Sequence, residues 1–400
     1  MNVFKKAYCR IFQKIMYLLI PFFPYREPEL LDTSNDILKV LNNKKINNIM
    51  LVTDKGIRNL GLTKELETVL LENNIKLTVY DKTLPNPTSD NVEEARSLYL
   101  ENNCNGLIAF GGGSVMDCAK AVGARIVCPK KQLKKMQGLI KIRKKLPLLI
   151  AVPTTAGTGS ETTVAAVIVD SQTQHKYVIN DFNLIPHFAL LDPKVTTTLP
   201  KHITSTTGID ALTHAVEAYI GKSRTKKTKK ASIEAVKLIF ENLEIAYNEG
   251  TNLTARKNML YAAYLAGTAF TKSYVGYVHA VAHTLGGKYH TPHGLANAVI
   301  LPYVLKEYKS KVYKPLADLA KFTKIVDENV STKEAAETFI SHIEKMNERM
   351  QIPSTLDCIK KEDITYMAKL ANKEGNPLYP VPVLWDAKEL EKIYILISEK

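Results

Sequence analysis

The chain has 400 residues, of which 45% are hydrophobic and 24% are charged, and its formal net charge is +14. This length and composition predict a globular protein with two domains, each able to bury a core. No run of about 18 or more apolar residues occurs, which excludes a membrane-spanning helix. Much of the positive charge lies in two lysine-rich runs without interleaved aromatics, residues 130–145 and 222–230. We therefore expect solvated surface loops there and no nucleic-acid partner.

The five cysteines are scattered along the chain and form no C-x-x-C pair. Their odd number and spacing argue against a disulfide framework and against a thiolate zinc site. Free thiols persist in reducing compartments, so we expect a cytoplasmic protein.

Residues 1–28 form a basic and apolar N-terminal extension. Apolar side chains recur at helical spacing up to Leu19, and basic side chains lie between them. Three interpretations stay open: a helix packed on the protein, a helix on a membrane surface, or a signal peptide without a small-residue cleavage site.

Short apolar runs alternate with amphipathic stretches between residues 45 and 195. Strands are predicted at 47–54, 75–81, 106–110 and 147–153, with helices at 63–74, 90–103 and 114–126 between them. This alternation predicts an α/β domain with a parallel sheet. Residues 164–170 and 175–181 are separated by a polar turn and predict an added hairpin.

The hydrophobic period changes after about residue 200. Five stretches repeat apolar residues at three- and four-residue spacing, which predicts a helical second half; they are 231–250, 258–270, 294–308, 332–350 and 387–400. We place the α/β domain at 29–198 and an all-α domain at 199–400, joined near the proline- and threonine-rich segment 190–200.

Two glycine-rich turns follow predicted strands. GGGS (111–114) follows one strand and opens a helix, and TTAGTGSET (154–162) follows another. Glycine lets a backbone approach a ligand closely, and a helix N-terminus favours an anion such as a pyrophosphate. Asp54 ends the first strand, where a carboxylate can accept hydrogen bonds from a ribose diol and would repel a 2′-phosphate. Together these features favour an adenine dinucleotide, NAD rather than NADP, although each alone also fits an ordinary turn or helix cap.

Four of the nine histidines fall within residues 279–294, HAVAHTLGGKYHTPHG. His279 and His283 stand four residues apart, which places both on one helical face, and Asp210 and His214 repeat that spacing. His290 and His293 follow a pair of glycines, where we expect the helix to break. Spacing alone leaves open which of the four histidines bind metal.

One carboxylate and several imidazoles suit a borderline divalent ion such as Fe²⁺ or Zn²⁺ and argue against Mg²⁺ or Ca²⁺. A single carboxylate leaves such a site net positive, which favours an anionic or polarised substrate oxygen. The chain contains no H-E-x-x-H, and no acid beside either pair offers an obvious hydrolytic base.

The sequence resembles the iron-containing (group III) alcohol dehydrogenases. The matching stretches cover about residues 50–300 in order: PNPT (85–88), GGGSVMDCAK (111–120), PTTAGTGSE (153–161), GIDALTHAVEAY (208–219) and GYVHAVAHTLGGKYHTPHGLANA (276–298). The resemblance implies a dinucleotide-binding domain, a helical domain, and a metal in the cleft between them.

The resemblance also implies roles for individual residues. Metal ligands would be Asp210, His214, His279 and His293, and His283 would lie beside the substrate as the catalytic residue. Residues implied to line the cofactor are Asp54, Asn86, Gly112, Gly113, Ser114, Asp117, Thr154, Thr155, Thr158 and Lys176. The extended, basic N-terminus and the segment 376–394 depart from the family pattern.

We therefore expect a homodimeric, metal-dependent alcohol dehydrogenase or aldehyde reductase that transfers a hydride between NAD(H) and a small primary alcohol or aldehyde. One alternative is a polyol dehydrogenase, or a lyase of the same fold family that uses NAD and metal. Another is a basic surface-binding protein with a vestigial site. No pattern in the sequence identifies the substrate.

Overall fold

The computed structural model describes residues 1–398; the last two residues of the predicted helix 387–400 lie outside them. Internal contacts divide the chain into two units, one made of residues 24–197 and one made of residues 1–23 together with 198–400. The N-terminal segment therefore belongs to the helical unit and does not form a separate extension up to residue 28.

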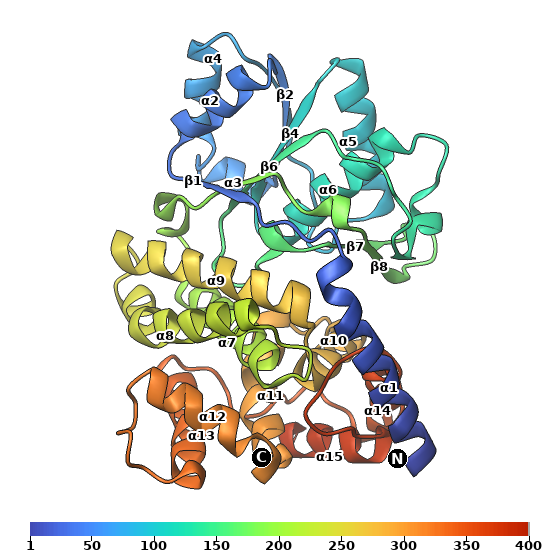
Figure 1. The fold of residues 1–400 in the computed structure, drawn as a ribbon. Coiled ribbons are helices and arrows are strands. Elements are labelled where there is room, and N and C mark those ends of the chain that lie inside the picture. The colour runs from blue at the N-terminus through green and yellow to red at the C-terminus, as the bar shows by residue number, and fades with distance from the viewer. Residues whose placement is uncertain (399–400) are drawn as a thin grey trace. The chain divides into compact units, whose positions relative to one another are not determined.

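A six-stranded parallel sheet forms the centre of the α/β unit, as predicted (Figure 1). Its strand order is β1-β9-β6-β4-β2-β3. The predicted strands correspond to β2 (Asn48–Val52), β3 (Lys76–Tyr80), β4 (Gly106–Gly111) and β6 (Leu148–Pro153). The two strands at the other end of the order, β1 (Glu29–Leu31) and β9 (Phe188–Leu190), were not predicted, because three residues carry too little periodicity.

The order of the sheet places the carboxyl ends of β2 and β4 at a switch point. From β2 the chain continues to β3 on one side and then returns to β4 on the other side. Ligands of open α/β sheets bind outside the carboxyl ends of strands where the order reverses in this way. The segments after Val52 and after Gly111 are therefore in the position where a nucleotide is expected.

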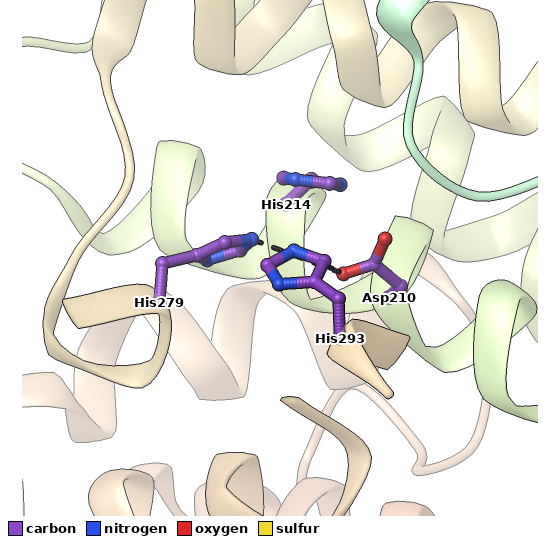
Figure 2. A group of neighbouring side chains, drawn as sticks. All are labelled: Asp210, His214, His279 and His293. Atoms are coloured by element: carbon purple, nitrogen blue, oxygen red, sulfur yellow. Dashed lines mark ion pairs between the residues drawn. The ribbon is translucent and has the colours of Figure 1, made fainter. Parts of the chain in front are cut away.

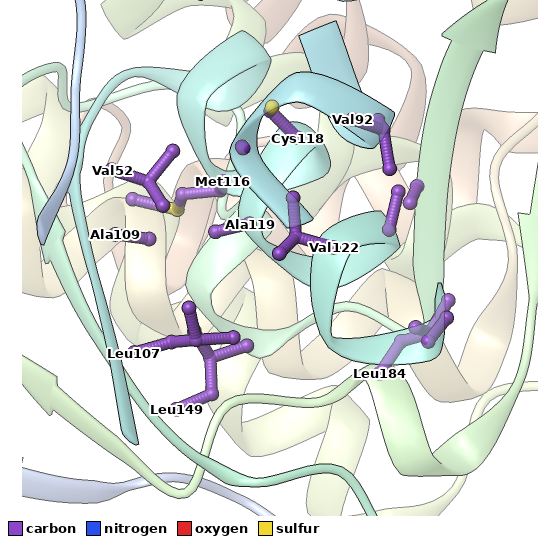
Figure 3. Packing of buried hydrophobic residues seen from close by; sticks show 14 of the residues in the cluster. Val52, Val92, Leu107, Ala109, Met116, Cys118, Ala119, Val122, Leu149 and Leu184 are labelled. Atoms are coloured by element: carbon purple, nitrogen blue, oxygen red, sulfur yellow. The ribbon is translucent and has the colours of Figure 1, made fainter. Parts of the chain in front are cut away.

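Helices cover the sheet and complete its hydrophobic core. The helices that follow the first strands are α3 (Lys55–Asn59), α4 (Lys64–Glu72), α5 (Ser89–Glu101) and α6 (Gly113–Val127), and α2 (Ser34–Asn43) precedes β2. Figure 3 shows Met116, Ala119 and Val122 of α6 beside Leu107 and Leu149 of the strands. All five side chains are buried, so α6 begins at a site held by a packed core.

The predicted hairpin is confirmed as the antiparallel pair β7 (Ala165–Val169) and β8 (Lys176–Asn180). The lysine-rich run 130–145 is not simply a solvated loop. It contains β5 (Gly138–Leu139), which pairs with β8, and its apolar residues Leu133, Met136 and Ile142 are buried. Its lysines lie on the surface while these apolar side chains pack inward. The high charge of the run concealed this apolar pattern in the sequence.

Lys120 of α6 is fully buried and fastens the second glycine-rich turn to the helix. Its ammonium lies 2.6–3.2 Å from five oxygens of Ser160, Thr163 and Ala165. Burial lowers the pKa of Lys120 to about 8, although Asp117 and Glu161 act in the opposite direction. The ammonium replaces the water that these oxygens would otherwise need.

We expect Lys120→Met to destabilise the protein by about 3–5 kcal/mol, because it keeps the volume but leaves buried oxygens and carboxylates without their cation. Urea unfolding followed by circular dichroism would measure the loss. The matched control is Lys144→Met, at an exposed lysine, which should change stability little. Equal stability of the two variants would contradict the role given to Lys120.

The second unit is helical, as predicted. The helices are α7 (Lys201–Ile220), α8 (Lys226–Asn248), α9 (Leu253–Ser273), α10 (Tyr277–Tyr289), α11 (His293–Tyr308), α12 (Ser310–Phe322), α13 (Thr332–Arg349), α14 (Ile364–Gly375) and α15 (Ala387–Ser398). The expectation of a loop throughout residues 222–230 is wrong, because α8 begins inside this run. Thr225 and Thr228 form a capping box that starts the helix despite four lysines in its first turns.

Residues 3–19 form helix α1 (Val3–Leu19), which contacts the segment 377–382 that follows α14 (Figure 1). Arg10 donates hydrogen bonds to the carbonyls of Val381 and Pro382, and Gln13 donates to those of Pro377 and Tyr379. The structure confirms a helix packed on the protein, and it leaves another face of that helix exposed. Within residues 1–398, no helix is both long and apolar enough to cross a membrane.

Candidate metal centre and nucleotide-binding turns

Helix α7 carries the first two predicted ligands. Asp210 and His214 lie one turn apart on this helix, and both are buried. The ring of His214 stacks on that of Phe270 from α9, with 4.1 Å between the ring centroids. This stacking orients the imidazole ring of His214.

Helices α10 and α11 carry the histidines of the second motif. His279 and His283 lie one turn apart on α10, and His293 is the first residue of α11. The expected helix break at the two glycines is wrong, because α10 continues through them to Tyr289. It ends at His290, whose φ of 56° is left-handed and which precedes the Thr291–Pro292 turn. His290 thus ends the helix and is not part of the cluster described next.

The structure brings Asp210, His214, His279 and His293 together (Figure 2). One ligand atom from each of the four lies within 4.8 Å of the others. The Nε2 atoms of His293 and His279 lie 3.4 Å and 3.9 Å from Oδ1 of Asp210. Two ligands bound to one ion at roughly 2.0–2.1 Å stand at most roughly 4.2 Å apart, so a small inward movement would let all four bind.

The chemistry of these side chains fits a divalent cation. Nε2 of His279 is buried and has no hydrogen-bond partner among the described residues. A buried nitrogen in this state destabilises the fold unless another group, such as a bound cation, contacts it. Burial and the neighbouring imidazoles of His214, His293 and His283 hold the pKa of His279 well below its usual range. The ring is therefore neutral, as a metal ligand must be. Three imidazoles and one carboxylate suit Fe²⁺ or Zn²⁺.

Glu217 holds His279 in position and was missed by the sequence analysis. Its carboxylate accepts a hydrogen bond of 2.6 Å from Nδ1 of His279 and further ones from the backbone N–H groups of Gly276 and Val278. A proton on Nδ1 leaves Nε2 as the nitrogen that faces Asp210 and His293. The signal was present in the sequence, because Asp210, His214 and Glu217 recur at the spacing of one helical face.

The same carboxylate caps the start of α10. Gly276, the N-cap residue of α10, has no side chain that could accept these N–H groups, and a Cβ there would stand 2.6 Å from the Glu217 carboxylate. Burial raises the pKa of Glu217 to about 7, while the backbone N–H groups of Gly276, Val278 and His279 act in the opposite direction. A single side chain from α7 thus fixes both the helix and the ligand on it.

Asn297 is a second contact that the sequence analysis missed. It is buried on α11, its amide donates a 2.6 Å hydrogen bond to Oδ1 of Asp210, and it lies 3.1 Å from Nε2 of His293. These contacts orient the carboxylate and an imidazole toward each other. Asn297 lies four residues after His293, so helical spacing could have indicated it.

His283 lies next to the cluster but has a different environment. Its ring stacks on that of His293 at 5.3 Å between centroids, yet its side chain is 43% exposed. Nδ1 of His283 lies 2.6 Å from Oε1 of Glu374, and the hydroxyl of Tyr379 donates to the same oxygen. Burial favours the neutral acid, but His283 and Tyr379 more than offset it, so the pKa of Glu374 falls below its ordinary value.

We expect Glu217→Gln to weaken metal binding by about 10–100-fold, the usual cost of losing the partner of a ligating histidine. An amide offers one oxygen where His279, Gly276 and Val278 present three N–H groups. Competition with a coloured chelator would measure the affinity of purified protein. Glu241→Gln, at an exposed site on the neighbouring α8, is the control. An unchanged metal affinity in Glu217→Gln would contradict the positioning role.

The two glycine-rich turns lie against each other at the carboxyl ends of neighbouring strands. Gly111 of β4 pairs with Pro153 of β6, and the N–H of Thr154 donates to the Gly111 carbonyl. A Cβ on Gly113 would lie 3.1 Å from the side chain of Thr158, so the two turns are in close contact at this point. Gly112, the N-cap of α6, makes no side-chain cap, so the first N–H groups of α6 are left without the cap that would otherwise occupy an anion's place.

The remaining residues expected at the cofactor surround this turn. Asn86 has a left-handed φ of 57°, its N–H donates to the hydroxyl of Ser114, and its side chain accepts a 2.7 Å bond from Lys176. Thr155 lies near Gly112, its hydroxyl 3.5 Å from where a Cβ would stand. Their place in the fold agrees with cofactor binding, but the contacts themselves stay a prediction.

Asp54 and Asp117 both have structural partners. Asp54 is the N-cap of α3 and accepts a 2.9 Å hydrogen bond from the N–H of Ile57. Asp117 accepts hydrogen bonds from the Ser160 hydroxyl and the Val167 N–H, and burial raises its pKa despite nearby Lys120. Asp117 therefore ties α6 to the second turn and the hairpin.

Comparisons with known proteins agree with this arrangement. A family model described as "Iron-containing alcohol dehydrogenase" matches residues 28–193, and one described as "Fe-containing alcohol dehydrogenase family, C-terminal" matches residues 204–395. The chain is 38% identical over 380 residues to a 1,3-propanediol dehydrogenase of Citrobacter freundii, covering 94% of this chain and 97% of that one. It is 36% identical to an NAD-dependent methanol dehydrogenase of Bacillus methanolicus, covering 84% and 87%.

Among solved structures, an alcohol dehydrogenase from Oenococcus oeni superposes with a TM-score of 0.88 at 34% identity, covering 93% of this chain and all of that one. The class defined by this fold and site is thus a metal-associated alcohol oxidoreductase. The chain belongs to the iron-containing alcohol dehydrogenase family, which confirms the resemblance found in its motifs.

Proposed function

We propose that this protein is a metal-dependent, NAD(H)-linked alcohol dehydrogenase, or aldehyde reductase, for small primary alcohols and aldehydes. The observation that carries the proposal is the convergence of Asp210, His214, His279 and His293 on one point in the helical unit. Fe²⁺ is the ion that the family name favours, and Zn²⁺ is the alternative that the same donors accept. When bound, such an ion acts as a Lewis acid toward the substrate oxygen.

The residues of the site have two kinds of role: some would hold the metal ion, and one would transfer a proton. Asp210 and the three imidazoles hold the ion, while Glu217 and Asn297 orient them. His283 is the more exposed imidazole beside this group, and its contact with Glu374 fixes its orientation. We assign His283 to exchanging the alcohol proton with solvent, since an accessible imidazole works near neutral pH.

NAD is the cofactor that the turns and Asp54 favour. Support comes from the uncapped start of α6 at a switch point of the sheet, from the hydroxyl-rich second turn, and from the methanol dehydrogenase relative, which is named NAD-dependent. The residues proposed to line the cofactor are Asp54, Asn86, Gly112, Gly113, Ser114, Asp117, Thr154, Thr155, Thr158 and Lys176.

We expect NADH to be preferred over NADPH, and Asp54→Ser to narrow that preference about ten-fold or more, because the carboxylate repels a 2′-phosphate. Serine keeps the cap on α3, since its hydroxyl can accept from the Ile57 N–H. Asp54→Gly removes both the carboxylate and the side-chain cap of α3. Comparing it with Asp54→Ser therefore separates the effect of the charge from the effect of the cap. The ratio of kcat/KM for the two cofactors is the measurement, and a wild-type preference for NADPH would contradict the role of Asp54.

The experiment that tests the proposed function is metal analysis combined with an aldehyde panel. Protein purified without oxygen would be assayed with NADH and NADPH against propanal, acetaldehyde, 3-hydroxypropanal and a polyol-derived ketone. We expect iron or zinc and NADH oxidation that depends on a small aldehyde. A lyase predicts no net NADH oxidation, a polyol dehydrogenase predicts a preference for the ketone, and a vestigial site predicts no metal.

The proposal includes a homodimer in the cytoplasm. All five cysteines, which lie in the described part of the chain, are free in the structure, and this supports a reducing compartment. Sedimentation velocity would measure the oligomeric state.

A further inference from the structure

Helix α1 is attached to the helical unit by its polar face. Cys9 and Gln13 are buried, Gln13 and Arg10 bind backbone carbonyls of the segment 377–382, and the N-terminal amine contacts Asp386. A surface helix normally turns its apolar stripe toward the core and its polar face toward water. In α1 the packed face carries Arg10 and Gln13 beside Cys9 and the half-buried Met16, and a second apolar stripe stays on the outside.

The opposite face of α1 is an exposed apolar stripe. We define the stripe as Phe4, Tyr8, Ile11, Ile15 and Leu18, whose alternating four- and three-residue spacing places them on one helical face. Every member is more than half exposed, from 52% for Ile15 to 87% for Phe4. At about 1.5 Å per residue the stripe is about 21 Å long. Exposed apolar patches of this kind mark interaction sites, because water contact with them is unfavourable.

Basic side chains border the stripe. Lys5, Lys6 and Lys14 are exposed, and residues 1–26 contain no aspartate or glutamate. Phe22 continues the exposed apolar surface just beyond the helix. An apolar face with aromatic residues, bordered by lysines, is typical of helices that lie in a membrane interface.

We propose that the stripe of α1 docks this enzyme on an anionic lipid surface. The apolar side chains would enter the boundary between headgroups and acyl chains, and the lysines would meet the anionic headgroups. Charge complementarity favours this partner over a second copy of the chain. Two α1 helices packed stripe to stripe would bring two sets of lysines together, and neither N-terminal segment contains an acid to pair with them. The polar face of α1 is already bound to the protein, so docking needs no unfolding.

Flotation of the full-length protein with vesicles would test the proposal. Vesicles of phosphatidylglycerol and phosphatidylcholine would be compared with vesicles of phosphatidylcholine alone, at low and high salt. We expect binding to the anionic vesicles that weakens with salt. Ile11→Gln/Ile15→Gln/Leu18→Gln should lower the partition coefficient about ten-fold or more, because it removes the apolar area that enters the interface. The double variant Lys5→Gln/Lys14→Gln should lower the partition coefficient less than the triple variant does.

Matched controls use equally exposed residues elsewhere. Leu60→Gln/Leu71→Gln removes exposed leucines of the α/β unit, and Lys314→Gln/Lys333→Gln removes exposed lysines of other helices. Neither should change vesicle binding, and the stripe variant should keep normal aldehyde reduction. Failure of the wild type to float, or equal flotation of the stripe variant, would overturn the proposal. A smaller oligomer of the stripe variant without vesicles would assign the stripe to a second copy and would also overturn it.

Discussion

Replacing His279 with alanine is expected to remove the metal and the activity together. His279 is buried, Glu217 fixes its Nδ1, and its Nε2 faces Asp210 with no hydrogen-bond partner among the described residues. Loss of a direct ligand should cost more than the roughly 10–100-fold in affinity that an outer partner costs. Because the ion supplies several kcal/mol of transition-state stabilisation, we expect turnover to fall by about 10²–10³-fold or more.

Metal per subunit, measured after purification without oxygen, is the deciding quantity. His293→Ala should behave in the same way, because its Nε2 lies 3.4 Å from the same carboxylate oxygen. His290→Asn is the matched control, since it lies in the same motif and asparagine tolerates the left-handed backbone of that position. Full metal occupancy in His279→Ala would show that the ligand set is misassigned.

His283→Ala is expected to retain the metal and to have a much lower turnover rate. His283 shares a helical face with His279 but lies outside the four-residue cluster, and its Nδ1 is engaged by Glu374. Four protein donors are already in place, and a catalytic ion would have to keep a position open for its substrate, so a fifth protein ligand would crowd the site. Loss of one positioned acid–base group typically lowers the rate by about 10²–10⁴-fold. We therefore expect near-normal metal and NADH binding, with low kcat and an altered pH profile.

The comparison requires His283→Ala and His279→Ala to be purified side by side. Glu374→Gln should alter the pH profile less than His283→Ala, since it leaves the imidazole in place and removes only its carboxylate partner. Equal metal loss in His283→Ala and His279→Ala would make His283 a ligand. That result would leave the fold and family unaffected and would overturn only the division of roles.

Much of the fold could be predicted because its signals are local. Strands β2, β4 and β6 are largely apolar runs, β3 is a short strand rich in β-branched and aromatic residues, and helices α4, α5 and α6 between them carry one apolar face. Strands β1 and β9, of three residues each, and β5, of two, are too short for any period to show. The start of α8 was missed because its lysines concealed the capping box of Thr225 and Thr228.

The sequence alone determined which residue types carry the chemistry: one aspartate and several histidines at helical spacing, and glycines after strands. These patterns follow from the 3.6-residue turn and from the backbone freedom of glycine, both of which are local properties. Only the tertiary structure decided which partners meet. Glu217 reaches His279 from another helix, Glu374 meets His283 across 91 positions of the chain, and α1 turns its polar face inward. Such contacts depend on how helices pack against one another, which no local period encodes.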